Sequence, residues 1–141
     1  MPAATALQSA IWTALAGSSP PTALYTAVGG RIYDKIPQSD EAAPDALFPY
    51  IVIGDDDISN DDTDTGLGFT ARVQVNVVSR YPGWKQIKDL QGQVYDLLHR
   101  AVLAIPGYTF TDSFVKEQHL VTNPDGKTRE GVVIVSVMFQ A

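Results

Sequence analysis

Apolar and polar residues alternate with a period of two along one stretch of the chain, residues 69–77. Such alternation is typical of a β-strand that buries one face. A second strand is predicted from Phe48 to Ile53, because that segment is rich in β-branched and aromatic residues and ends at Gly54. A polar, charged stretch separates the two, so we expect an antiparallel hairpin with a solvated loop. The apolar positions of the alternating strand are Phe69, Ala71, Val73, Val75 and Val77.

Two other segments have the three-and-four spacing of helices that bury one face. The first, Ala3–Ala16, is rich in alanine and leucine and is followed by Gly17. The second is predicted from about Trp84 to Leu103 and is ended by Pro106 and Gly107. The apolar face of the first helix consists of Leu7, Ile11 and Leu15, and that of the second of Ile87, Leu90, Val94, Leu97, Leu98, Ala101 and Ile105.

The remaining segments give weaker patterns. The sequence allows a short helical turn over residues 22–28 and a short edge strand over residues 31–33. Residues 34–47 carry two prolines among polar residues and predict a loop.

The last third of the chain predicts a second hairpin. Strands are expected over Phe114–Val121 and Gly131–Phe139, and the sequence Asn-Pro-Asp-Gly at 123–126 is a strong turn signal. The final strand is apolar at successive positions, so both of its faces should be covered, either within the domain or by a neighbouring chain.

This order of elements predicts one domain over residues 1–141 with an α+β fold. We expect an antiparallel sheet of about four strands with two main helices packed on one face.

Charge is concentrated in one place. The net charge is −6, and six aspartates lie within ten residues between the first two predicted strands: Asp55, Asp56, Asp57, Asp61, Asp62 and Asp64. The ten basic residues are scattered, so no face is expected to grip nucleic acid. The chain has no cysteine and no apolar run of the roughly 18 to 20 residues that cross a membrane, so no thiolate chemistry and no membrane contact are expected.

Few residues suggest catalysis. His99 and His119 are the only histidines, and neither belongs to a nucleophile motif. Glu117 and Glu130 are placed so that they could face each other across the last hairpin, but nothing marks a cleft around them. Glycine-rich phosphate motifs are absent. We therefore expect no enzyme activity, no catalytic residues and no cofactor.

The sequence leaves three interpretations of the aspartate-rich stretch open. It is a solvated connector, a charged surface that faces a partner or a channel, or a calcium- or ligand-binding loop. The spacing does not fit an EF-hand, since a loop starting at Asp55 or Asp57 lacks the required glycine and glutamate. No metal site is therefore predicted.

Several segments in a fixed order resemble one family. They are ALQSAIWTAL, VGGRIYDKIP, FPYIVIGDDD, a strand ending VVSR, IKDLQGQVYDLL and NPDGKTREGVVIVSV. Together they span nearly the whole chain and resemble the small tail-completion, or tail terminator, proteins of long-tailed bacteriophages and gene transfer agents.

The resemblance implies a structural virion protein without catalytic residues, made in the host cytoplasm and located in the tail-neck region. Such proteins form a ring, typically a hexamer, that caps the head-proximal end of the tail tube. The ring contacts the tail tube protein and the head-completion or connector protein, and genomic DNA passes through it without specific binding. A head-completion ring on the connector side of the same joint is the alternative.

Overall fold

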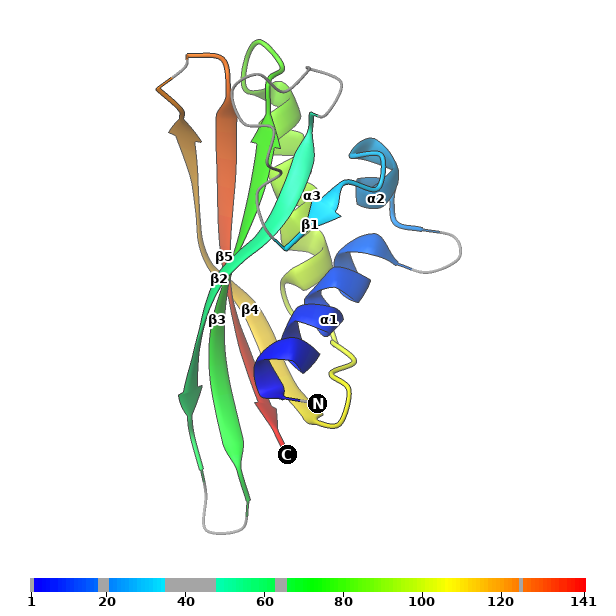
Figure 1. The fold of residues 1–141 in the computed structure, drawn as a ribbon, viewed down its shortest axis with the longest axis vertical. Helices are drawn as coiled ribbons and strands as arrows, with labels where there is room; N and C mark the ends of the chain where they lie inside the picture. Colours follow the sequence, from blue (N-terminus) through cyan, green and yellow to red (C-terminus); the bar gives the residue numbers. More distant parts are fainter. Residues whose placement is uncertain (1, 18–20, 35–47, 63–65, 125) are drawn as a thin grey trace.

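The computed structural model describes residues 2–17, 21–34, 48–62, 66–124 and 126–141 (Figure 1). Its elements are α1 (Ala3–Ala16), α2 (Ala23–Ala27), β1 (Ile32–Tyr33), β2 (Tyr50–Asn60), β3 (Gly68–Ser79), α3 (Lys85–Leu98), β4 (Thr109–Thr122) and β5 (Arg129–Gln140). The strands form one sheet in the order β1-β2-β3-β5-β4. Helices α1 and α3 lie on the same side of this sheet (Figure 1).

The α+β class is confirmed, but the predicted sheet was wrong in two respects. It has five strands instead of four, and it is mixed, because β1 runs parallel to β2 while the other pairs are antiparallel. With two residues, β1 carries no alternation that would reveal its direction. A parallel neighbour also requires a long crossover connection, and the sequence does not distinguish such a connection from an ordinary loop.

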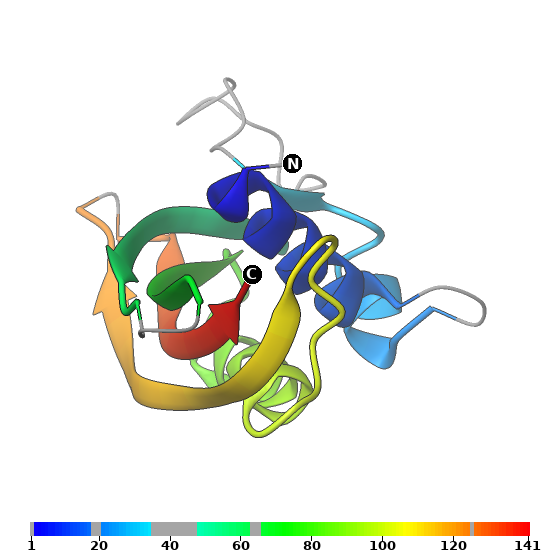
Figure 2. The same cartoon turned by 90° about the horizontal axis from the view of Figure 1, so that it is seen from below.

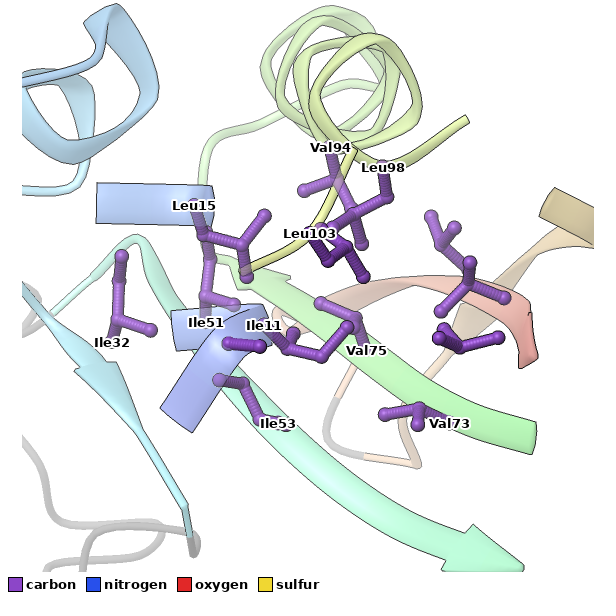
Figure 3. Packing of buried hydrophobic residues seen from close by; sticks show 14 of the residues in the cluster. Ile11, Leu15, Ile32, Ile51, Ile53, Val73, Val75, Val94, Leu98 and Leu103 are labelled. Atoms are coloured by element: carbon purple, nitrogen blue, oxygen red, sulfur yellow. The ribbon is translucent and has the colours of Figure 1, made fainter. Parts of the chain in front are cut away.

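The core lies between the helices and the covered face of the sheet. The predicted face of α1 is confirmed, since Leu7, Ile11 and Leu15 have no exposed surface. They pack with the valines of β3 that the alternation predicted, which are at most 2% exposed. Figure 3 shows Ile11 and Leu15 of α1, Val94 and Leu98 of α3, and Val73 and Val75 of β3 within this single apolar cluster.

Helix α3 ends earlier than predicted, at Leu98 instead of Leu103. His99 is extended and Arg100 is left-handed (φ 58°), which turns the chain out of the helix. The Ser113 hydroxyl of β4 donates to the carbonyls of Leu98 and Ala101 at 2.9 Å each and holds this exit in place. Leu103 and Ile105 are still buried, at 2% and 4% exposure, whereas Val102 before Leu103 is 85% exposed and Ala104 between the two is also exposed. The apolar stripe therefore continues in an extended segment with a period of two.

Strand β2 runs further than predicted. It passes Gly54 and continues to Asn60 opposite β3, with a register shift between Ile53 and Asp56. This bulge absorbs a break in the alternation, so the polar sequence stays in the sheet. The β2–β3 hairpin consequently extends well beyond the helix layer at the bottom of Figure 1.

The last hairpin is confirmed with longer strands. Gly126 has a left-handed backbone (φ 71°) and its amide donates to the Asn123 carbonyl at 3.1 Å, as the turn signal predicted. Two register shifts in β4 account for its irregular alternation. Viewed along the strands, the sheet is strongly curled (Figure 2).

Strand β5 is buried on both faces within the single chain. On the face away from the helices, Val132, Ile134 and Ser136 are 4–8% exposed. The sequence left open whether the second face of this strand is buried within the domain or by a neighbouring chain. In the structure it is buried within the domain, so the burial of β5 does not require a second chain.

Among the described helices, none is long and apolar enough to span a membrane. The loop predicted for residues 34–47 lies almost entirely outside the described residues.

Candidate partner-binding surface

The aspartate-rich stretch divides between a strand and a hairpin end. Asp55, Asp56 and Asp57 lie in β2, not in a loop as predicted, and Asp61 and Asp62 follow the strand. All five are exposed, and Asp64 lies outside the described residues. Because alternate residues of a strand point to opposite faces, the three strand aspartates do not converge on one point.

The end of the β2–β3 hairpin is closed by backbone contacts. The Asp61 amide donates to the Gly68 carbonyl at 2.7 Å, and the Gly68 amide donates to the Asp62 carboxylate at 3.3 Å. A side chain at position 68 would collide with the Asp61 carbonyl oxygen, 2.3 Å from where a Cβ would stand. Gly68 is therefore required by this close approach, and Asp62 is the aspartate with a structural contact here.

An ion pair crosses the open face of the sheet, the face away from α1 and α3. Arg72 of β3 lies opposite Ser136, and Glu117 of β4 lies opposite Ile134. The Arg72 guanidinium and the Glu117 carboxylate are 3.8 Å apart, and their side chains are more than half exposed. Because β5 runs between β3 and β4, the pair spans it, and the two stems cover its apolar residues. In this exposed position the pair stabilises the fold by at most about 1 kcal/mol.

A small apolar cluster lies on the same open face, near the start of β2. Tyr50, Val52 and Val78 are 3–9% exposed, and Tyr33 and Phe48 pack against them. The Tyr50 ring lies 5.1 Å from that of Phe48 and 6.0 Å from that of Tyr33. Burial raises the pKa of the Tyr50 hydroxyl, and the negative charge of Glu130 adds to this effect. These three aromatic residues thus belong to a cluster separate from the main core.

The residues considered for catalysis are not assembled into a site. His99 accepts a hydrogen bond from the Val115 amide at its Nδ1 (3.1 Å) and stacks on Tyr95, so its role is structural. His119 is exposed in β4. Glu117 lies opposite Ile134 and Glu130 opposite Val121, so the two glutamates do not face each other. The described residues thus place no catalytic group in an assembled site.

Within the described residues, no group of three or more histidine, aspartate or glutamate side chains is arranged to hold a metal ion. The strand geometry of Asp55, Asp56 and Asp57 gives the physical reason, since a calcium loop wraps its ligands around one point.

The sequence reasoning missed a set of polar residues on the open face. Gln74 and Asn76 of β3 are half-buried and share a hydrogen bond of 3.0 Å, and Glu130 of β5 is half-buried beside them. Their signal was available, because they alternate with buried valines and a strand with polar residues on one face leaves that face uncovered. Gln8 of α1 and Asp34 after β1 line the same surface. They are distant in sequence from the polar residues of β3 and β5, so no sequence pattern predicted that they would lie there.

Comparison with known proteins identifies the family. A search of curated protein sequences gave no match. One chain of a solved structure described as "Virion of native gene transfer agent (GTA) particle" has the same fold, with a TM-score of 0.83 and 20% sequence identity. The alignment covers 99% of this chain and 98% of that one.

The family profile described as "Tail completion protein gp17" matches residues 9–140. Since this match takes in nearly the whole chain, the protein belongs to the tail completion protein gp17 family and is a structural protein of a phage-type tail.

Proposed function

We propose that the protein forms a closed ring, a hexamer, at the head-proximal end of the tail tube. There it stops growth of the tube by the tail tube protein and offers its other face to the head-completion or connector protein. Genomic DNA passes through the ring without specific binding. The match of residues 9–140 to the tail completion family carries this proposal.

The fold agrees with a chain of a gene transfer agent virion, which supports a place in such a particle. The protein would be made in the host cytoplasm and end in the tail-neck region, with a structural and not a catalytic role. Because β5 is already covered within one chain, the ring is inferred from the family and not from an unburied strand.

The extended β2–β3 hairpin is the candidate contact with the channel or a partner. It projects beyond the helix layer and carries exposed Asp55, Asp56, Asp57, Asp61 and Asp62, to which Asp64 is added from the sequence. Negative side chains repel DNA phosphates, so a channel wall of this kind lets DNA slide without sticking.

Deleting the gene in the phage or gene transfer agent that encodes the protein tests this function. Without a terminator, tube polymerisation has no stop, so electron microscopy should show overlong tubes and heads without tails. Supplying the protein in trans should restore tubes of normal length. Tubes of normal length beside heads that have lost their DNA would instead place the protein on the connector side, as a head-completion ring.

Light scattering on the purified protein, with and without isolated tail tubes, tests the ring itself. We expect a closed oligomer at high protein concentration or on the tubes. A chain that stays monomeric under both conditions would contradict the ring.

A further inference from the structure

A hollow of about 620 Å³ opens on the β2 side of the sheet. It is lined by α1, the residue after β1, the bulged part of β2, and the open-face residues of β3 and β5. Its apolar part is formed by Val52 and Val78, which are 6% and 3% exposed and belong to the cluster around Tyr50. The hollow thus combines concave shape, an apolar floor and a face of the sheet that none of the described helices covers.

The charged groups around the hollow have a single sign. Asp34, Asp55, Asp56 and Glu130 line it, and among the described residues of its wall none is a lysine or an arginine. A second hollow of about 180 Å³ shares Asp55, Asp56 and Gln74 with the first and extends it along β2 to Asp57. Arg72 lies in the wall of this extension, and its guanidinium is engaged with Glu117.

Glu130 is unusual among these carboxylates. It is half-buried, and burial raises its pKa, with no positive group contributing to the shift. A glutamine has nearly the same size and shape as Glu130 but would place no desolvated charge here. A negative group is therefore kept here at a cost to the isolated chain, and a cation brought by a partner would offset that cost.

We propose that this hollow is the docking site for a lysine- or arginine-bearing segment of another virion protein, which places an apolar side chain on Val52 and Val78 and its positive charge beside Asp55 and Glu130. This inference rests on the proposed function, because it assumes a place in an assembled particle. DNA is unsuited to the hollow, since its phosphates have the same sign as the wall.

A second copy of this chain is a poor occupant. Most of the described basic side chains already make contacts within their own chain: Arg31 to the Phe48 and Pro49 carbonyls, Arg72 to Glu117, Arg80 to Phe48, Lys85 to Asp89, Arg100 to Asp112 and Arg129 to Trp84 and the Tyr81 carbonyl. Lys88, Lys116 and Lys127 lie on α3, on β4 and in the β4–β5 turn, so they form no cluster. The part of the chain that the structure describes thus offers no basic cluster that fits the hollow, which favours a different protein as the source of the positive segment.

Photo-crosslinking in assembled particles tests the occupant. A benzophenone amino acid replaces Gln74 in the hollow or, in a second variant, the exposed Gln8 at its rim, so that one poorly folding variant does not end the experiment. After irradiation, mass spectrometry should find a crosslink to another virion protein in a segment rich in lysine or arginine. Crosslinks only to a second copy or to DNA, or no crosslink from particles that carry the folded variants, would overturn the proposal.

A charge variant tests the recognition chemistry. In Asp55→Asn/Glu130→Gln we expect particle yield to fall at least tenfold, while the melting temperature is unchanged or higher. The matched control, Asp89→Asn/Asp96→Asn, removes the same charge from exposed positions of α3 and should keep the yield. Equal yields from the two variants would overturn the docking site.

Tube length separates this inference from the proposed function. If the protein is a terminator, tubes keep their normal length in the hollow variant while joining fails. The gene deletion tests the terminator role alone: overlong tubes are expected when the whole protein is missing, whatever the hollow binds.

Discussion

The two faces of the sheet differ in what their side chains do. On the covered face, Val75 and Val133 lie opposite each other in the register, and both are fully buried under the helices. On the open face, Asn76 lies opposite Val132, and Val78 lies opposite the half-buried Glu130. The covered face therefore holds the fold together by apolar burial. The open face combines apolar residues with half-buried and exposed polar and negative groups, and it is the face on which we propose that a partner binds.

The largest expected effect is on the covered face, at the end of α3. Leu98 has no exposed surface, so Leu98→Ala should lower the free energy of unfolding by about 2–5 kcal/mol. Leu97, which the sequence placed on the same stripe, is only partly buried, so Leu97→Ala should cost clearly less. Urea denaturation of both variants measures the difference. Equal losses would mean that the two leucines share the core and that the helix face is wrongly assigned.

The next effect concerns Gln91, a polar side chain on the buried face of α3. The Gln91 amide donates to the carbonyls of His119 and Val132, at 3.1 and 3.0 Å. Gln91→Met keeps the volume but removes both bonds, so it should cost about 1–3 kcal/mol of unfolding free energy. Lys88→Met on the exposed side of the same helix is the control and should change stability by less than about 0.5 kcal/mol. Similar values for the two variants would contradict the buried role of Gln91.

Neutralising the acidic hairpin should spare the fold. Replacing all six aspartates between positions 55 and 64 by asparagine should change stability by less than about 1 kcal/mol, because the five that the structure describes are exposed. Asparagine at position 62 retains an oxygen that can accept from the Gly68 amide. Melting temperature is measured together with particle yield, which we expect to fall. An unchanged yield would make the stretch a solvated connector, and a collapsed melting temperature would assign the carboxylates a structural role.

The smallest effect is a pH-dependent gain at Glu130. Its pKa is raised in the folded chain, so the ionised carboxylate destabilises the fold at neutral pH, and this cost disappears as pH falls through the folded pKa. Tyr50 lies beside it, with Arg80 and Tyr33 acting on that tyrosine. Glu130→Gln should therefore melt at a slightly higher temperature than the unmodified chain at pH 7. The gain should vanish in acid, and a loss of stability at pH 7 would contradict the assignment.

Periodicity located α1, β3 and the start of α3 because apolar burial repeats with the period of the element. It misjudged the end of α3, since Leu98, Ala101 and Ile105 fit a helical stripe, while Ala101, Leu103 and Ile105 equally fit a strand. A contact distant in sequence, from the Ser113 hydroxyl to the Leu98 and Ala101 carbonyls, decides between the two.

The acidic stretch was misjudged for the same kind of reason. Asp55, Asp56 and Asp57 have a low preference for strands, yet they continue β2 because β3 supplies the hydrogen-bonding partner and a bulge absorbs the register shift. Likewise, the ion pair that spans β5 joins Arg72 of β3 to Glu117 of β4, and no local pattern connects these two residues. The tail-completion resemblance, by contrast, was readable from the order of segments along the chain.

The sequence by itself determined the family, the α+β class, the covered faces of α1 and β3, and the concentration of negative charge near residue 60. These properties depend on neighbours within one element or on residue order along the chain. Only the tertiary structure decided the direction of β1, the length of β2 and the hollow that brings Asp34, Asp55 and Glu130 together. Each of these depends on pairing between segments distant in sequence, and one-dimensional periodicity carries no information about which segments meet.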